Sequence, residues 1–354
     1  MSFRFTLALA FTGLSLASCA SLPPPVPVIA RSETATWDSS ASRSSQLAIW
    51  SGGYQIGSGM VSQGFVAAAT ESGGLTLRDF QGAVLQQLPG RRLTDIDVAA
   101  LPLDEGFTVM VGGTVRALSR TRIAIFRLNS NGVQAAQPWT EVTTDLSDPR
   151  GFCMRQTADG VQAVAFDRRG EARQFTISEG PDGAVVARET RRFRIPQAGR
   201  GCGIAAVSGH LYVSHARRGF WRYPLDATSS LAPTHMAAEG PAALPRSESV
   251  AIFSARGFTY LASLHPDGTA VSLWRVDRTD LMWVGRIEVR DPSDGRRVRK
   301  LTGVDIHGYE LEGFPDGLMV VRGQAGARTS DLRYVDWSLV LRALGVEPAP
   351  IIAQ

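Results

Sequence analysis

Arginine is the residue type whose chemistry stands out in this chain. Lys300 is the single lysine, so nearly all of the 37 basic side chains are guanidinium groups. A guanidinium presents several N–H donors in a planar fork that matches carboxylate and phosphate oxygens. Any site for an anionic ligand must therefore be built from forked donors. Ordinary solvated loop residues are the alternative interpretation of these arginines.

The first cysteine, Cys19, points to a lipid anchor. It ends the string Leu16-Ala17-Ser18-Cys19, which follows Arg4 and an apolar stretch. This string looks like a bacterial lipobox, in which the cysteine is acylated and the preceding residues are removed. An ordinary signal peptide that contains a cysteine is the alternative. The interpretation predicts a signal peptide over residues 1–18 and a lipidated, proline-rich tether over 19–39.

The predicted lipid anchor also predicts where in the cell the protein lies. A lipidated Cys19 without a following aspartate indicates the bacterial cell envelope, at the outer membrane and facing the periplasm. The membrane is then touched by acyl chains only, because the longest apolar run is about half of the ~20 residues that a spanning helix needs. In that oxidising compartment Cys153 and Cys202 could form a disulfide, and two unpaired buried thiols are the alternative.

Composition excludes several classes of protein. The 354 residues are 44% hydrophobic and 20% charged, which is enough to bury a large core and excludes intrinsic disorder. A net charge of +4 spread along the chain does not indicate a nucleic-acid partner. The 36 glycines and 19 prolines favour many short elements over long helices. We expect a monomer.

These side chains must be positioned by short strands, because a strand-like pattern repeats about every fifty residues. The repeated segment is a run of β-branched and aromatic residues that ends before a turn. Its six occurrences are Leu75 to Asp79, Ile123 to Leu128, Arg173 to Ile177, Phe220 to Leu225, Val271 to Val276 and Leu332 to Trp337.

Two more strand-like segments precede each occurrence, and turn residues separate them. The innermost segments of the units are Leu47 to Trp50, Asp95 to Ala100, Gly151 to Met154, Gly203 to Val207, Ser249 to Phe253 and Gly303 to Ile306. The pattern predicts an all-β fold, a single six-bladed β-propeller of four-stranded antiparallel sheets over residues 40–345. We expect a helical turn over Asp336 to Leu344, at the end of the last blade. Residues 346–354 are predicted to form a C-terminal tail. A pair of β-sandwiches is the alternative.

Six segments, in order along the chain, also match strings of a known family. That family has strings of the form PAIW, GGLYVYDLDG, GEFEQYEL, YIAEEDEAIWKF, IEGL and DGIDV. The matching segments here are Leu47-Ala48-Ile49-Trp50, Gly73 to Gly82, Gly170 to Ile177, Tyr212 to Tyr223, Ser247 to Val250 and Thr302 to Ile306. On these segments the chain resembles the β-propeller phytases, secreted bacterial enzymes that hydrolyse phosphate esters of inositol hexakisphosphate with bound calcium.

The resemblance implies a calcium site made of carboxylates, because Ca²⁺ takes ~6 to 8 oxygen ligands. The positions that keep an acid are Asp97, Glu248 and Asp305. Other family acids are replaced, one of them by Cys202 and others by His215 to Arg218 and by Arg299 to Leu301. A cation at a ligand position repels Ca²⁺, so the resemblance implies calcium as the cofactor while the sequence predicts an eroded site.

The resemblance also implies phosphate-binding cations. Arg116 and Arg168 match family residues that bind phosphate, and Arg150 stands where the family has a tyrosine. Together with Arg200, Arg217 and Arg218, these residues predict a cationic channel mouth. No catalytic residue is assigned.

Two functions follow. One is a phosphomonoester hydrolase of the phytase type that acts on inositol hexakisphosphate. The other is a non-catalytic envelope propeller that binds an inositol phosphate, another phosphorylated small molecule or a protein partner through its arginines.

Overall fold

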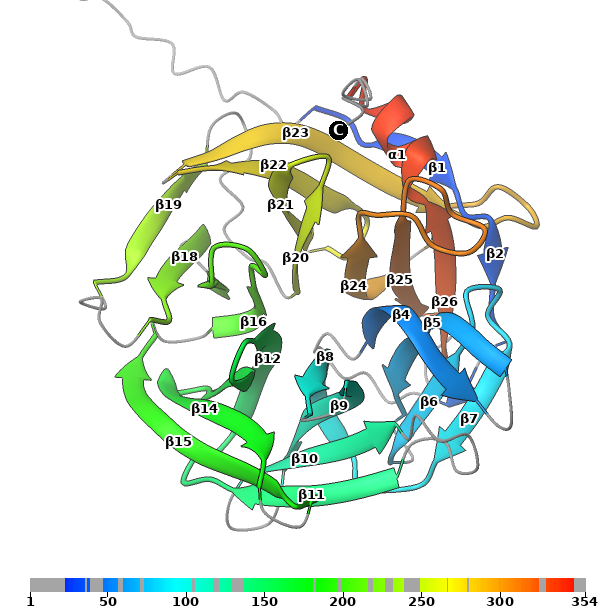
Figure 1. The fold of residues 1–354 in the computed structure, drawn as a ribbon. Coiled ribbons are helices and arrows are strands. Elements are labelled where there is room, and N and C mark those ends of the chain that lie inside the picture. Colours follow the sequence, from blue (N-terminus) through cyan, green and yellow to red (C-terminus); the bar gives the residue numbers. More distant parts are fainter. Residues whose placement is uncertain are drawn as a thin grey trace, which may run out of the picture.

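Short strands separated by tight turns build six blades, which form a ring (Figure 1). The central channel of the ring contains a cavity lined by residues of all six blades. The structure, a computed structural model, describes residues 23–35, 37–38, 47–56, 60–70, 73–103, 106–116, 121–128, 137–180, 183–195, 199–215, 219–226, 232–238, 249–265, 267–278, 280–298, 300–324 and 329–346. Within that part the chain is a six-bladed β-propeller of four-stranded antiparallel sheets, as the repeat predicts.

The first three blades follow the chain in order. Blade 1 contains β4 (Leu47–Ile56), β5 (Met60–Ala69), β6 (Leu75–Arg78) and β7 (Val84–Leu88). Blade 2 contains β8 (Leu93–Pro102), β9 (Phe107–Arg116), β10 (Thr121–Leu128) and β11 (Gln137–Thr143). Blade 3 contains β12 (Pro149–Thr157), β13 (Gly160–Asp167), β14 (Glu171–Glu179) and β15 (Val185–Arg194).

The next three blades complete the ring. Blade 4 contains β16 (Gly199–Ile204), β17 (His210–His215), β18 (Gly219–Pro224) and β19 (Thr234–Ala238). Blade 5 contains β20 (Val250–Ala255), β21 (Phe258–Leu264), β22 (Val271–Asp277) and β23 (Asp280–Arg290). Blade 6 contributes β24 (Leu301–His307), β25 (Leu318–Gln324) and β26 (Thr329–Asp336). The strands β19 and β23 also pair with each other, so the sheets of blades 4 and 5 are continuous.

Residues close to the N-terminus complete blade 6, whose own segment supplies only three strands. The strands β2 (Ser32–Glu33) and β3 (Trp37–Asp38) pair with β26, and β1 (Val26–Ile29) pairs in parallel with β23. Arg333 of β26 reinforces this closure with an ion pair to Glu33. The ring therefore takes in part of the segment that the sequence analysis assigned to the tether, because the outer edge of blade 6 needs a partner strand.

Apolar side chains fill the gaps between neighbouring blades. The described residues form six clusters of buried apolar side chains, and each cluster joins two blades that are neighbours in the ring. Each sheet thus buries both faces against its neighbours, which a single sheet cannot do. The first strands β4, β8, β12, β16, β20 and β24 contact one another in that order around the channel.

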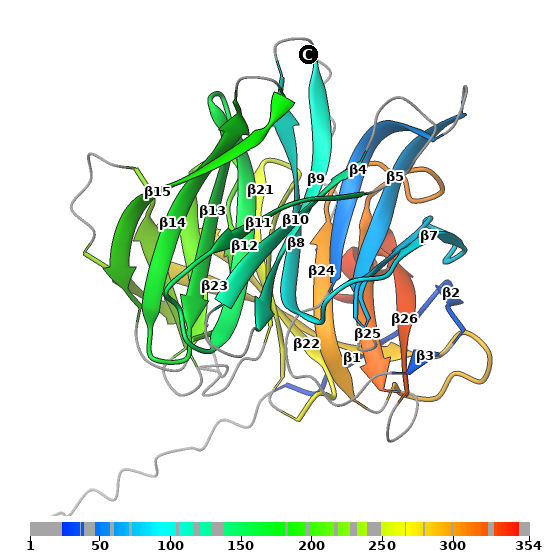
Figure 2. The same cartoon turned by 90° about the horizontal axis from the view of Figure 1, so that it is seen from below.

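The antiparallel register gives the ring two distinct faces (Figure 2). The first strand of each blade begins at one face of the ring, which we call the start face. It ends at the opposite face, which we call the end face. The turn between the second and third strands of a blade returns to the start face. The turns between the first and second strands, and between the third and fourth, lie on the end face.

A helix follows the last strand, at the place where the sequence hints at a helical turn. It is α1 (Trp337–Ala343), and the Asp336 side chain caps it by accepting a hydrogen bond from the Ser338 backbone N–H. Trp337, Val340 and Leu341 are buried against blades 5 and 6. Among the described residues, no helix has the length and apolar character needed to cross a membrane.

Candidate functional site

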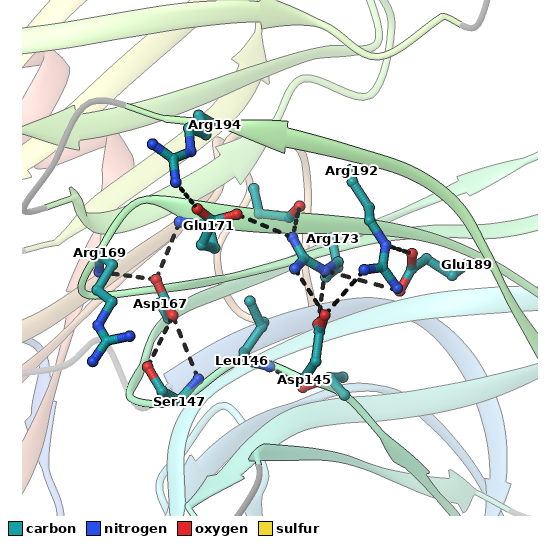
Figure 3. A network of polar contacts seen from close by, with 12 residues as sticks. Asp145, Leu146, Ser147, Asp167, Arg169, Glu171, Arg173, Glu189, Arg192 and Arg194 are labelled. Atoms are coloured by element: carbon teal, nitrogen blue, oxygen red, sulfur yellow. Dashed lines mark hydrogen bonds and ion pairs between the residues drawn. The ribbon is translucent and has the colours of Figure 1, made fainter.

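The turn between β13 and β14 is held by one buried carboxylate. Oδ1 of Asp167 accepts the backbone N–H groups of Arg169 and Glu171, at 2.8 and 3.1 Å. Its Oδ2 accepts the hydroxyl of Ser147 at 3.1 Å (Figure 3). A carboxylate that accepts several N–H and O–H donors fixes the backbone around it. Asp167 therefore determines how the turn presents Arg168 and Arg169.

Arg168 and Arg150 lie together on the start face of blade 3. Pro149 pairs with Asp167, and the Arg168 backbone N–H donates to the Asp148 carbonyl at 2.9 Å. The Arg150 side chain is 34% exposed and contacts Asp148 at 3.3 Å, whereas Arg168 is exposed. The structure thus brings these two predicted phosphate-binding residues onto adjoining strand ends.

A second ion-pair group holds the loop that leads into blade 3. Arg173 of β14 donates from Nε and from a terminal nitrogen to the two carboxylate oxygens of Asp145, at 2.8 and 3.0 Å (Figure 3). Arg192 also contacts Asp145 at 3.1 Å. The hydrogen bonds and charges of the arginines, those of Arg173 foremost, lower the pKa of Asp145. The loop over residues 145–148 is therefore held from two sides, by Arg173 and by Asp167.

The predicted metal ligands lie elsewhere, in the central channel. A cavity of about 330 Å³ is lined by all six first strands, and both Asp97 and Asp305 line it. Arg150 and Arg168 do not line this cavity. The structure brings the two acids together, and it separates them from the arginines.

Each channel acid accepts hydrogen bonds from a neighbouring blade. Oδ2 of Asp97 in blade 2 accepts the Met154 backbone N–H of blade 3 at 2.6 Å. Oδ2 of Asp305 in blade 6 accepts the Ile49 backbone N–H of blade 1 at 2.8 Å. The remaining Oδ1 atoms accept N–H groups of the following residues, Val98 and Ile306, at 2.8 and 2.9 Å.

A third channel acid, which the sequence analysis did not predict, also accepts a hydrogen bond from a neighbouring blade. Asp95 of β8 is buried, and its Oδ2 accepts the Phe152 backbone N–H at 3.0 Å. Because the inner edge of a first strand has no strand partner, its N–H groups need acceptors. The carboxylates supply them, so each acid links two blades at the channel.

Burial disfavours the ionised form of these channel acids. Loss of hydration raises the pKa of Asp97 and of Asp305 to about 7, and for Asp97 the nearby charge of Asp305 contributes as well. Burial also raises the pKa of Asp95. His307 lines the same cavity, and burial lowers its pKa to about 4, so its imidazole is neutral at pH 7.

The family implies calcium, and the described residues do not fit a calcium cage. All four carboxylate oxygens of Asp97 and Asp305 already accept backbone N–H groups. In the described ranges, no three His, Cys, Asp or Glu side chains gather into a metal-binding group. A calcium ion needs ~6 to 8 oxygens, and these residues do not supply them.

Cys202, which the resemblance places at the position of a family acid, lies in a disulfide. Cys202 of blade 4 is joined to Cys153 of blade 3 by a disulfide. Both residues are buried in the cluster between these blades. At the channel, a covalent link thus joins blades 3 and 4, whereas carboxylate hydrogen bonds join blades 2 and 3 and blades 6 and 1.

Several predicted residues lie outside the described part of the chain. They are Cys19, Glu248, Arg217 and Arg218, and the side chain of Arg116, whose backbone ends β9. Arg200 opens β16 on the start face. The predicted roles of these residues stay predictions.

Sequence reasoning did not find Asp95, Asp145 or Asp167. Asp95 stands two positions before Asp97 on one strand, so both side chains point to the same side. Asp167 begins the string Asp167-Arg168-Arg169-Gly170, and Asp79 begins the similar string Asp79 to Gly82. Oδ1 of Asp79 likewise accepts backbone N–H groups, those of Gln81 and Ala83. The string of an aspartate with a glycine three residues later was the available signal.

Three known proteins are similar to this chain. The 3-phytase of Bacillus subtilis (strain 168) is 20% identical over 289 residues, which is 78% of this chain and 75% of that protein. A sialidase of Trypanosoma rangeli, solved with 2,3-difluorosialic acid, is 11% identical with a TM-score of 0.49, covering 86% of this chain and 56% of that one. A protein of unknown function from Bacteroides thetaiotaomicron VPI-5482 is 10% identical with a TM-score of 0.48, covering 87% and 75%.

Both solved structures have TM-scores below 0.5. The family comparison is broader, because the model of the family described as "Phytase" matches residues 3–348 and so includes every strand of the ring. The chain therefore belongs to the phytase family.

Proposed function

We propose that this protein hydrolyses phosphomonoesters of the inositol phosphate class at the start face of blade 3. The observation that carries the proposal is the family match across all six blades. The related Bacillus protein is a 3-phytase. Support from the geometry comes from Arg150 and Arg168, which share one corner of the start face.

The arginines account for ligand binding. A phosphate ester approaching the turn at Arg168 meets an exposed guanidinium that has no ion-pair partner among the described residues. A guanidinium can bind two phosphate oxygens at once and stabilises the charge that the equatorial oxygens carry during transfer. Asp167 acts as a positioning residue, because it fixes the turn that carries Arg168.

The test is phosphate release from inositol hexakisphosphate by the purified protein, with millimolar calcium and separately with chelator. We expect release that falls about tenfold in Arg168→Ala, the loss of one charge-assisted contact. Arg278→Ala is the matched control, because Arg278 is an exposed arginine on the end face. Absence of release under both conditions would reject hydrolysis.

A second candidate is binding without hydrolysis. The observation that favours it is that the oxygens of Asp97 and Asp305 are occupied by backbone N–H groups. A propeller of this kind binds a phosphorylated ligand through its arginines, with affinity that falls as salt rises and does not change with chelator. Calorimetric titration with inositol hexakisphosphate separates the candidates: heat of binding without phosphate release supports the second, and binding abolished by chelator rejects it.

We also propose that the chain works as a monomer on the cell envelope, held by acylation of Cys19. The support is the string Leu16 to Cys19 and the prolines that follow it. Labelling of growing cells with a radioactive fatty acid should mark the protein and should fail to mark Cys19→Ala. Equal labelling of both forms would contradict the anchor.

A further inference from the structure

The exposed charges of the start face that lack partners are positive. Arg168, Arg169 and Lys300 are exposed, and none of them has an ion pair within the described ranges. Arg168 and Arg169 occupy the turn between β13 and β14, and Lys300 precedes β24. All three therefore lie on the face at which the first strands begin.

The acids of that face have partners. The most exposed of them, Asp267 in the turn between β21 and β22, is 53% exposed and is bound by His265 and Thr269. Asp145 is bound by Arg173 and Arg192, and Glu171 is paired with Arg194. Asp167 is buried and accepts backbone N–H groups. These acids hold the backbone and do not neutralise the exposed arginines, so the positive potential of the start face is left facing solvent.

The end face shows the opposite pattern. Its turns carry exposed acids that have no ion pair among the residues described, and these are Asp159, Asp277, Asp280, Glu310 and Glu312. Arg278 is an exposed cation among them. The ring is therefore polarised across its thickness, and an anionic surface is attracted to one face and repelled by the other.

The first described residues, Pro23 to Ile29, run along the outer edge of blade 5 and reach the start face at Ile29, which pairs with Arg290 at the end of β23. Figure 2 shows β1 at the lower side of the ring together with β3, which pairs with Thr329 and Ser330 at the beginning of β26. The third strand of each blade begins on the start face, so β3 lies at this face. Pro23 precedes β1 and accepts a long hydrogen bond from Arg286, and Cys19 stands four residues earlier. Four residues reach at most about 14 Å, so an acylated Cys19 would hold the outer edge of blade 5 close to the membrane.

From this polarity and this attachment we infer that the start face docks on an anionic lipid surface. Guanidinium and ammonium groups contact lipid phosphates, and the acidic end face points away. The inference does not rest on the proposed hydrolysis. It rests on the charges of the two faces and on the proposed acylation of Cys19.

The test uses the chain from residue 20 onward, which contains every strand and helix that the structure describes. Co-sedimentation with vesicles of phosphatidylglycerol and phosphatidylcholine is compared with vesicles of phosphatidylcholine alone. We expect binding to the anionic vesicles only, and its loss as salt rises.

Substitutions on each face test which face binds the vesicles. Arg169→Ala with Lys300→Ala should weaken vesicle binding on the order of 25-fold, about fivefold for each cation. Arg278→Ala on the end face is the control and should change it less than twofold. A circular dichroism spectrum and melting curve like those of the unmodified chain show that the double variant is folded.

Three results would overturn the inference. They are no binding to anionic vesicles at low salt, equal binding to both kinds of vesicle, and equal losses in the double variant and in Arg278→Ala. Soluble inositol hexakisphosphate, titrated separately without vesicles, tests the proposed ligand site, so that failure of one proposal is distinguishable from failure of the other.

Discussion

Carboxylates in two regions of this propeller have pKa values that are shifted in opposite directions. At the start face of blade 3, Asp145 faces Arg173 and Arg192, and these arginines lower its pKa. In the channel, the hydrogen bonds that Asp97 and Asp305 accept from the described residues come from backbone N–H groups, and burial raises the pKa of each to about 7. The two regions contain the same residue type in different surroundings.

The difference teaches that a retained acid is not by itself a retained metal ligand. Asp97 and Asp305 stand at positions where the family resemblance implies calcium. In the structure each of them satisfies unpaired donors on the inner edge of the next blade. Cys202, at another position where the resemblance implies an acid, also links two blades, through a disulfide.

The largest expected effect concerns that covalent link. Cys153→Ala with Cys202→Ala should lower the free energy of unfolding by about 4 kcal/mol, because the disulfide closes a loop with a sequence separation of 49. Urea unfolding measures it. Reduction of the unmodified chain with dithiothreitol should give a similar loss. A change below about 1 kcal/mol would mean that the link between blades 3 and 4 does not carry the stability assigned to it.

Removal of a channel acid should come next. Asp97→Ala leaves the Met154 backbone N–H without its acceptor in a buried place, which costs about 2 to 3 kcal/mol. Asp97→Asn retains one acceptor oxygen and should lose less. Urea unfolding in the presence of chelator compares the two. Equal stability of Asp97→Ala and the unmodified chain would contradict a structural role.

The pH dependence of stability should differ between the two regions. Asp97 and Asp305 titrate near 7 in the folded chain and near 3.8 in the unfolded chain, so the folded state holds more protons between these values. Stability from these groups is therefore fully present below pH 3.8 and is lost as pH rises toward 7, at a rate of about 1.4 kcal/mol per pH unit for each group.

Replacement of both acids by asparagine should flatten that slope. The measurement is the urea midpoint at several values between pH 4.5 and pH 7, with chelator present. A slope unchanged by the double substitution would assign the pH dependence to other groups.

The smallest effect is expected at the start face. Arg173→Met keeps the aliphatic packing of the chain and removes its ion pairs. The three acids that lose their partner, Asp145, Glu171 and Glu189, are 48%, 29% and 30% exposed and regain water. The loss should be below about 1 kcal/mol. A loss comparable to that of Asp97→Ala would show that the ion pairs, and not the channel acids, are the stronger links.

Much of the fold could be predicted from the sequence, because the strands repeat and turns separate them. The predicted inner segment Asp95 to Ala100 lies within β8, and the predicted helical turn at Asp336 is capped by that residue. The pairing of β2 with β26 could not be predicted, since a two-residue strand depends on an edge that another blade leaves open.

The candidate site was predicted only in part. The resemblance pointed to Arg150 and Arg168, and the structure places them side by side. The hydrogen bonds of Asp97 and Asp305 could not be predicted, because they depend on how two blades pack at the channel. Local sequence carries no signal for which backbone N–H a neighbouring blade will present.

The most direct test of this account is calorimetric titration of inositol hexakisphosphate, with chelator, into two variants. Asp97→Asn combined with Asp305→Asn should bind with a Kd within about twofold of the unmodified chain, and Arg168→Ala should bind about tenfold more weakly. A double asparagine variant that loses binding while Arg168→Ala retains it would contradict the account.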